Sequence, residues 1–231
     1  MTQSKKYYQA YDERYRQVHE QSLQWSSLSP SPIVSKILEI YHISKNDPIL
    51  EIGCGEGRDA VCLLQNGYPL LATDISAEAI SYCRKHYSEH ADSFRILDCL
   101  TERLPEKYDF IYAIAVLHML TEDSDRSRFY RFLHDHLKEK GIALICTMGN
   151  GTEEWQTDSS QAFELQKRVH QQSGKEIFIA ATSCRKVSFE TLKQETAAEF
   201  LTILESGMTS IPPDFPGIMY AVIKRAPVSS L

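Results

Sequence analysis

Three glycines and a strand-ending carboxylate are the residues of this 231-residue chain that could do chemistry together. Gly53, Gly55 and Gly57 alternate with other residues directly after an apolar run, and Asp74 ends the next apolar run. Backbone without side chains lets a ligand approach closely, and a carboxylate accepts hydrogen bonds from hydroxyl groups. The pattern therefore predicts a ligand site with a backbone cradle and a carboxylate one strand later.

The spacing of these glycines argues against the common phosphate-binding loops. Dinucleotide sites favour GxGxxG, where the third glycine allows close helix packing beside a pyrophosphate, but this chain reads GCGEGR from Gly53 to Arg58. A P-loop needs GxxxxGK[ST], and the sequence contains no such segment. The ligand is therefore expected to lack a phosphate that the loop must hold.

Two more acids add constraints on the ligand. Asp98 closes a third apolar run, and Glu51 lies just before the glycines. Asp74 could accept hydrogen bonds from two ribose hydroxyls, and Asp98 from an adenine amine, although Asp98 could instead cap a helix. A ligand with a ribose, an adenine and a cationic end would use all of these groups. S-adenosylmethionine (SAM) is such a ligand.

Positioning these residues requires strands whose carboxyl ends meet at one edge of a sheet. Between residues 32 and 148, amphipathic stretches alternate with short apolar runs, which is typical of βαβ units. We expect strands at 48–53, 70–75, 93–98, 108–115 and 142–148, helices starting at Pro32, Arg58 and Ser76, and a helix through 129–137 ended by Gly141. Ligands of such sheets bind at the carboxyl ends of the strands.

The last part of the chain is less regular. The expected elements are a polar loop at 149–160, a helix at 161–172, a strand at 175–181, a helix from Ser188 to Phe200, and strands at 201–207 and 217–225. A short proline-bearing loop separates the two closing strands, so they could form an antiparallel pair at one edge.

Four segments in this order, LEIGCGEG, LLATDIS, ILDCL and YDFIYAIAVLH, resemble the class I SAM-dependent methyltransferases over about residues 32–148. GIMYAVIKR resembles that family's last strand. The resemblance implies a doubly wound, Rossmann-like α/β fold with a mostly parallel seven-stranded sheet and an antiparallel last strand. It also implies methyl transfer from SAM to an oxygen, nitrogen or sulfur atom of a small molecule, with S-adenosylhomocysteine as product. Residues 53–76 are also similar to the tellurite-resistance and thiopurine methyltransferase groups.

The same resemblance implies a set of cofactor contacts. Gly53, Gly55 and Gly57 would pass under the methionine part of SAM, Cys54 belongs to that loop, and Glu51 would help order it. The remaining expected contacts are Asp74 at the ribose, Ile75 against the adenine, Asp98 and the Cys99 amide at the adenine edge, and Ala113 and Ala115 beside the sulfonium.

Some candidates have two interpretations at this level. Arg58 is either a solvated helix start or a partner of the methionine carboxylate. His118 follows the fourth strand and could be a general base, or it could simply pack. Tyr11 and Tyr15, one helical turn apart, are either a packed stripe or, with Trp25, part of a lid over the cofactor.

We expect residues 1–30 to form a helical lid and residues 31–231 to form the SAM-binding domain, with an acceptor-site insertion at about 149–185. The acceptor pocket would include Trp155 and the segment 182–185. Arg168, Arg185 and Lys186 could bind an acidic acceptor or could be solvated surface charges.

Composition limits the partners. Asp and Glu number 31 against 25 Lys and Arg, so the net charge of −6 argues against a nucleic-acid surface. The chain has no apolar run long enough to cross a membrane, and its six cysteines form no CxxC pair. These features favour a cytoplasmic monomer or homodimer with reduced thiols and no metal site.

Other classes of function remain open. A non-catalytic SAM-binding sensor or partner subunit would share the cofactor site, and an RNA or protein methyltransferase is a less favoured reading. Amino-directed nucleic-acid methyltransferases carry [DN]PP[YF] after the fourth strand, where this chain reads AIAVLH. An aminopropyltransferase needs an acid after that strand, and residues 113–118 contain none.

Overall fold

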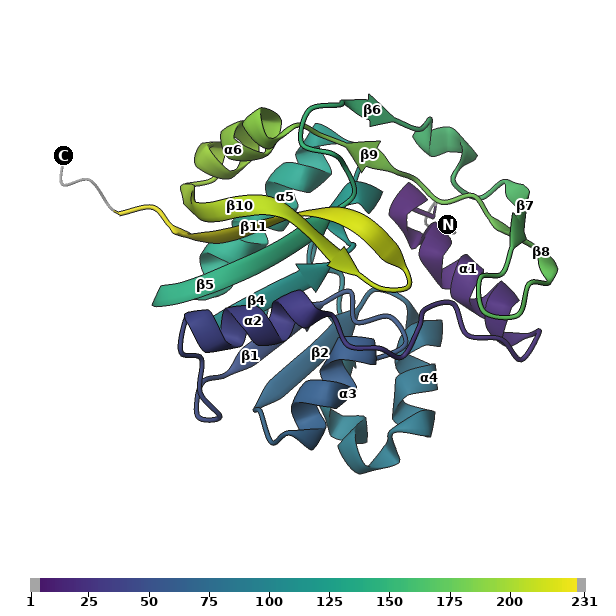
Figure 1. Ribbon diagram of the computed structural model, residues 1–231, viewed down its shortest axis with the longest axis horizontal. Coiled ribbons are helices and arrows are strands. Elements are labelled where there is room, and N and C mark those ends of the chain that lie inside the picture. The colour runs from purple at the N-terminus through teal and green to yellow at the C-terminus, as the bar shows by residue number, and fades with distance from the viewer. Residues whose placement is uncertain (1–4, 228–231) are drawn as a thin grey trace.

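A seven-stranded sheet forms the centre of the molecule in the computed structural model, which describes residues 5–227 (Figure 1). The strands are β1 Ile49–Ile52, β2 Leu70–Asp74, β3 Phe94–Ile96, β4 Tyr108–Ile114, β5 Leu137–Thr147, β10 Leu201–Ile211 and β11 Phe215–Arg225. Their spatial order is β10-β11-β5-β4-β1-β2-β3. β11 runs antiparallel to both neighbours and the other pairs are parallel. The expected fold class is confirmed.

Helices connect these strands. The α-helices are α1 Ala10–His19, α2 Pro32–Ile40, α3 Arg58–Gln65, α4 Ala77–His86, α5 Asp123–His136 and α6 Phe189–Ala198; the 3-10 helices are η1 Tyr7–Gln9, η2 Ser88–Ser93, η3 Leu117–Met119 and η4 Ser159–Gln161. The hydroxyls of Ser76 and Ser188 accept hydrogen bonds from the first turns of α4 and α6, as their sequence positions predict. Within residues 5–227, no helix has the length and apolar character needed to cross a membrane.

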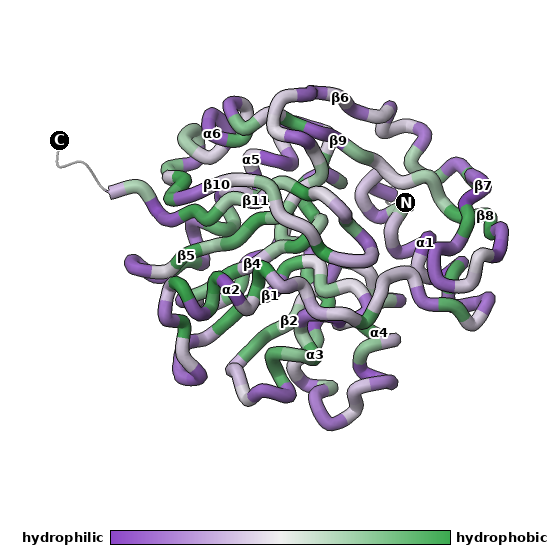
Figure 2. Tube along the Cα trace, viewed as in Figure 1, coloured by the Kyte–Doolittle hydropathy of each residue, from purple (hydrophilic) through white to green (hydrophobic). Residues whose placement is uncertain are grey.

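The core lies on both faces of the sheet, and the apolar colouring in Figure 2 follows the central strands. Ile49 and Phe110 pack with side chains from α2, α3 and α4, whereas the next residues, Leu50 and Ile111, pack with side chains from α5 and α6. Consecutive strand residues point to opposite faces, so strands covered on both sides need continuous apolar runs. The result is a three-layered α/β domain.

The boundary between α5 and β5 differs from the expectation. α5 ends at His136 and β5 begins at Leu137, so Gly141 lies inside the strand rather than at a helix end. A Cβ at Gly141 would lie 2.7 Å from the backbone oxygen of Tyr108, where the pairing of β4 and β5 shifts register. The glycine is therefore needed for close strand contact, and the apolar pattern could not distinguish this from a helix stop.

The expected helix over residues 161–172 is wrong. β7 (Leu165–Val169) pairs antiparallel with β8 (Glu176–Ala180), and β6 (Trp155–Gln156) pairs with β9 (Arg185–Lys186). In β8 the side chains of Ile177 and Ile179 are buried. Backbone pairing with β8 outweighs the local helix preference of the 161–172 segment.

The N-terminal helix packs on this inserted hairpin. α1 contacts β8 and α4 (Figure 1), and Val18 of α1 is fully buried with Ile177 and Ile179. Ala10 packs in the same way with Ala180. The N-terminal segment and the insertion therefore share a small apolar core beside the sheet.

Candidate functional site

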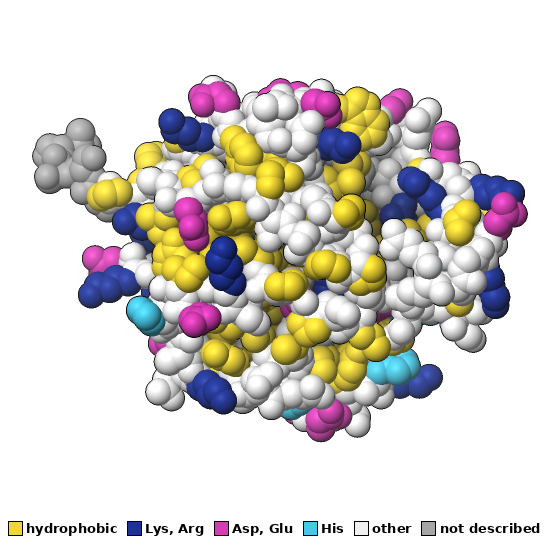
Figure 3. All heavy atoms as spheres, viewed as in Figure 1, with side chains coloured by type: hydrophobic (Ala, Val, Ile, Leu, Met, Phe, Trp, Pro, Cys, Tyr) yellow, Lys and Arg dark blue, Asp and Glu magenta, His cyan; other side chains and the backbone are white. Residues whose placement is uncertain are grey.

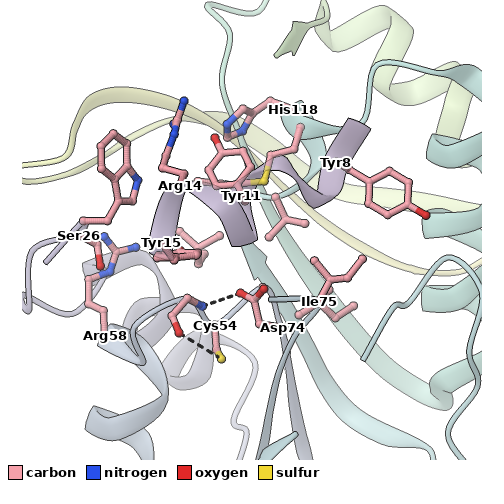
Figure 4. A pocket seen from close by; sticks show the side chains of 18 of the residues that line it. Tyr8, Tyr11, Arg14, Tyr15, Ser26, Cys54, Arg58, Asp74, Ile75 and His118 are labelled. Carbon is pink, nitrogen blue, oxygen red and sulfur yellow. Dashed lines mark hydrogen bonds between the residues drawn. The ribbon is translucent and has the colours of Figure 1, made fainter. Parts of the chain in front are cut away.

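A cavity of about 450 Å³ lies at the carboxyl ends of β1, β2 and β4, with α1 beside it (Figure 4). Fourteen of the residues expected from the sequence line it: Tyr11, Tyr15, Trp25, Glu51, Gly53, Cys54, Gly55, Arg58, Asp74, Ile75, Asp98, Cys99, Ala115 and His118. Strand ends, the glycine loop and the N-terminal segment therefore meet around one space.

Two expected residues lie outside the cavity wall. Gly57 is the N-cap residue before α3, with a φ of 84°, and a Cβ there would lie 3.1 Å from the Cys83 sulfur. Ala113 is buried within β4 and packs in the core on the α5 side. Gly57 thus shapes the loop behind the cavity, and Ala113 supports the strand beneath it.

Asp74 holds the glycine loop in place. One of its carboxylate oxygens accepts the Gly55 N–H at 2.8 Å and the other accepts the Ser76 N–H at 2.8 Å. Burial raises the pKa of Asp74 to about 6, although these amide hydrogen bonds favour the ionised form. Near neutral pH the ionised carboxylate therefore predominates, with further acceptor capacity toward the cavity.

Gly55 explains why the loop needs glycine at its centre. Its φ is 53°, in the left-handed region, and a Cβ would lie 2.5 Å from the Tyr15 hydroxyl. Tyr15 therefore covers the glycine loop directly, and any side chain at residue 55 would collide with it.

Glu51 and Arg58 lie beside this loop. Glu51 is buried and accepts a hydrogen bond of 2.9 Å from the Tyr112 hydroxyl, and burial raises the pKa of its carboxyl well above the usual range. Arg58 donates to Asp214 at 2.8 Å and approaches Asp59 at 3.4 Å. Its buried Nε has no hydrogen-bond partner among the described residues. Arg58 is therefore paired with carboxylates and still has one donor in the cavity wall.

Asp98 caps a turn rather than a helix, since no helix begins in the described residues between β3 and β4. One carboxylate oxygen accepts the Leu100 N–H at 3.0 Å, as a capping residue does, and the other accepts the Tyr8 hydroxyl at 3.3 Å. Asp98, Cys99 and Ile75 line the same cavity. The carboxylate is thus ordered by its own turn and by the N-terminal segment.

Glu56 is a residue of this site that the sequence interpretation missed. Its buried carboxylate accepts the backbone N–H groups of Trp25 and Ser26, each at 2.8 Å, and lies 2.9 Å from Nε2 of His19. The acid inside GCGEGR therefore fastens the N-terminal segment to the glycine loop. The position of Glu56 in a glycine loop indicated a role near the site. Its partners could not be identified from the sequence, because they lie 30 or more positions away in the chain.

His118 lies in η3 and is 3% exposed. Its Nδ1 is buried and has no hydrogen-bond partner in the described part of the chain. Burial, and then the charges of Arg126 and Arg14, lower the pKa of His118 to about 3. A neutral imidazole can exchange hydrogen bonds with a ligand, but it is a weak base for proton removal.

Arg14 is a residue of the cavity wall that the sequence interpretation missed. Its guanidinium is buried, donates to the backbone oxygens of Ala180 and Ala181, and lies over the Tyr11 and Trp25 rings at 4.9 and 4.7 Å. Figure 4 shows it on the same side of the cavity as Tyr11 and His118. Arg14 therefore joins the N-terminal helix to the insertion at the cavity wall.

The expected acceptor segments only partly reach the cavity. Arg168, Val169, His170 and Gln171 of the insertion line it, but Trp155 and residues 182–185 do not. Trp155 is 55% exposed and lies under Lys186, and Arg185 pairs with Asp123. The antiparallel hairpin β7–β8 brings the 168–171 segment to the site, which the helix expectation could not foresee.

The comparison with protein families identifies the central segment. Residues 49–141 match a family model described as a methyltransferase domain. This segment runs from β1 to β5 and contains the glycine loop, Asp74 and Asp98.

Curated relatives match a similar part of the chain. A ubiquinone biosynthesis O-methyltransferase of Rickettsia canadensis is 27% identical over 118 residues, which are 50% of this chain and 49% of that protein. A juvenile hormone acid O-methyltransferase of Drosophila melanogaster is 33% identical over 81 residues, 31% of this chain and 27% of that protein. The matches thus span no more than about half the length of these relatives.

A solved structure extends the likeness in fold to almost the whole chain. The 1,6-didemethyltoxoflavin-N1-methyltransferase of Burkholderia thailandensis, solved with 1,6-didemethyltoxoflavin and S-adenosylhomocysteine, superposes with a TM-score of 0.67. The superposition covers 98% of this chain and 92% of that one at 17% sequence identity. At this identity the similarity is one of fold.

Proposed function

Since residues 49–141 match a methyltransferase domain, we propose that the chain belongs to the class I SAM-dependent methyltransferase family and is an enzyme that transfers a methyl group from SAM to a small-molecule acceptor. The observation that carries the proposal is the buried Asp74 carboxylate, which orders the glycine loop and faces the same cavity.

The residues present fit SAM on three counts. Gly53 and Gly55 have left-handed backbone and line the cavity, so the loop presents backbone rather than side chains of its own to a ligand. Asp74 offers acceptor oxygens, as a ribose diol requires. The unpartnered Arg58 Nε is a buried donor in the wall and can bind an acid group of the cofactor.

We assign the cofactor half of the cavity accordingly. Asp74 would hold the ribose, Ile75 would pack on the adenine, and Asp98 with the Cys99 amide would bind the adenine edge. Glu51 and the loop 53–55 would lie beside the methionine part. Tyr15 and Trp25 would cover the loop from the N-terminal segment, and Tyr11 and Ala115 complete the wall.

SAM, when bound, supplies a methyl group on a positively charged sulfur, which is already a strong electrophile. The protein then has to align the acceptor and exclude water. Tyr15 covers Gly55, and Arg14 ties α1 to the insertion through the backbone oxygens of Ala180 and Ala181, so the N-terminal segment could serve to exclude water. His118 can orient an acceptor by a hydrogen bond, since its low pKa makes it a poor proton acceptor.

We further propose residues 1–30 as a lid on the domain formed by residues 31–231, with the insertion at about 149–185 adding to the acceptor side. The Glu56 hydrogen bonds to Trp25 and Ser26 support this, because they link the lid to the cofactor loop. A cytoplasmic location is also proposed, since the six cysteines are free thiols, four of them buried.

Calorimetry with SAM, S-adenosylhomocysteine, NAD and ATP tests the cofactor, and release of S-adenosylhomocysteine over a panel of small acceptors tests turnover. We expect binding of the first two compounds only, and turnover with at least one acceptor. Tight NAD binding without SAM binding would refute the proposal. SAM binding without turnover of any acceptor would favour the sensor or partner-subunit reading.

A further inference from the structure

The two halves of the cavity differ in charge. The acidic side chains in its wall are Glu51, Asp59, Asp74, Asp98 and Asp214. Each accepts hydrogen bonds within the protein. Glu51 accepts from the Tyr112 hydroxyl, Asp59 from Ser31, and Asp74 from the Gly55 and Ser76 amides. Asp98 accepts from Tyr8 and Leu100, and Asp214 from Arg58 and Ser27. These carboxylates all lie on the side proposed for the cationic cofactor.

The opposite side of the cavity is cationic. Arg14 of α1 and Arg168 of β7 both line it, and burial, with a smaller contribution from the positive charge of Arg168, lowers the pKa of Arg14. Within residues 5–227, neither arginine forms an ion pair with a carboxylate. Two guanidinium groups that line one cavity without ion-pair partners create a positive potential there, which an anion would relieve.

The hydrogen-bonding capacity at this end also points to a ligand. In the described part of the chain, Nε and Nη2 of Arg14 donate hydrogen bonds to the backbone oxygens of Ala180 and Ala181, and Nη1 donates none. His118, 3% exposed, has an unpartnered Nδ1 and lies next to Arg14 in the view of the cavity (Figure 4). The buried Nδ1 of His118 in the cavity wall lacks a partner, and a bound ligand can supply one.

Arg168 lies at the entrance. It is exposed, whereas Arg14 is buried, so an anion entering the cavity would meet Arg168 first and Arg14 deeper inside. Figure 3 shows Lys and Arg side chains gathered on the part of the surface that holds β7 and β8. The other cations considered from the sequence, Arg185 and Lys186, lie outside the cavity and have other contacts.

We propose that the methyl acceptor is a small organic acid, whose anionic group is bound between Arg14 and Arg168. This inference rests on the proposed methyl transfer and specifies its substrate class. Guanidinium groups bind carboxylates through paired, charge-assisted hydrogen bonds, and two such groups would hold the acid in one orientation. His118 Nδ1 supplies a further hydrogen-bonding atom beside Arg14 for the rest of the acceptor.

The test compares acids with matched neutral molecules on protein saturated with S-adenosylhomocysteine. The probes are benzoate and benzamide, and hexanoate and hexanamide, with dissociation constants from ligand-observed NMR titration. We expect each acid to bind at least about tenfold more tightly than its amide, the difference that one charge-assisted contact gives. Equal affinity of acids and amides would overturn the inference.

Arg168→Gln provides the second arm, because the exposed side chain can be replaced without loss of core packing. This variant should weaken acid binding about tenfold or more and leave amide binding unchanged. Lys167→Gln is the matched control, since Lys167 is the neighbouring cation, pairs with Glu176 and does not line the cavity. Equal effects of the two substitutions on acid binding would also overturn the inference.

A parallel calorimetric titration with S-adenosylhomocysteine separates this inference from the proposed function. If the cofactor product binds but the acids do not bind better than the amides, only the substrate class is wrong. If S-adenosylhomocysteine itself fails to bind, the methyltransferase proposal fails and the substrate class fails with it.

Discussion

Asp74 is the residue on which the proposed cofactor site depends most, since it both orders the loop and faces the ligand. Asp74→Ala removes an ionised acceptor from two proposed ribose hydrogen bonds, each worth roughly 1.5 to 3 kcal/mol. SAM affinity should fall about tenfold to more than a hundredfold in calorimetry. Asp92→Ala, at an exposed acid in η2, is the control. A loss of less than about threefold, within the usual context dependence of such contacts, would contradict the ribose assignment.

The raised pKa of Asp74 predicts how binding depends on pH. Ribose hydroxyls donate to the ionised carboxylate, so SAM should bind best above pH 6 and lose affinity as the pH falls through about 6, where the free protein takes up a proton at Asp74. Below that value the affinity should fall by up to about tenfold per pH unit. Calorimetry between pH 5 and 8 measures this dependence. An unchanged pH profile in Asp74→Ala would assign the effect to another group.

At the scale of elements, Glu56 connects the N-terminal segment with the glycine loop. Glu56→Ala leaves the half-buried Trp25 and Ser26 amides without their acceptor, and loss of a hydrogen bond to a charged group costs about 1.5 to 3 kcal/mol. We expect faster hydrogen exchange in residues 19–27 and weaker SAM binding, with exchange in the central strands unchanged. Glu89→Ala, at an exposed glutamate in η2, is the comparison variant.

If Glu56→Ala leaves exchange in residues 19–27 at the level of the Glu89→Ala variant, the carboxylate does not hold the segment.

The same experiment with SAM present tests the lid directly. SAM should slow exchange around Tyr11 and Tyr15, because closure and binding would be coupled. Unchanged exchange there would mean that the tyrosines are ordinary packing residues.

Removal of residues 1–30 tests the packing between α1 and the inserted hairpin. The deletion uncovers Ile177 and Ile179, which Val18 buries in the intact protein. We expect faster hydrogen exchange in β8 and much weaker SAM binding, but a retained sheet, since the sheet core contains few N-terminal side chains. Loss of exchange protection in β1 and β4 would show instead that the N-terminal segment is part of the main core.

For the whole molecule, cofactor binding should appear as thermal stabilisation. A ligand that binds only the folded state at a hundred times its dissociation constant adds about 2.7 kcal/mol to the free energy of unfolding. For a domain of this size that corresponds to a rise of about 5 to 10 °C in melting temperature. Differential scanning fluorimetry with S-adenosylhomocysteine measures the shift. Asp74→Ala should show a smaller shift at the same ligand concentration, and an equal shift would argue for binding elsewhere.

The sheet and the cofactor side of the cavity could be predicted from the sequence because their signals are local. Continuous apolar runs mark strands buried on both faces, and Ser76 and Ser188 cap the helices that follow them within three residues. The order of β1, β2 and β3 places Asp74 and Asp98 at one edge, since parallel neighbours end together.

The acceptor side was decided by tertiary structure. β7 is a strand because β8 pairs with it, β5 begins at Leu137 because β4 lies beside it, and Arg14 reaches the cavity because α1 packs on β8. Glu56 acquires its role from amides about thirty residues earlier in the chain. Contacts between residues far apart in sequence leave no periodicity or motif in either segment. They could therefore be identified only in the folded structure.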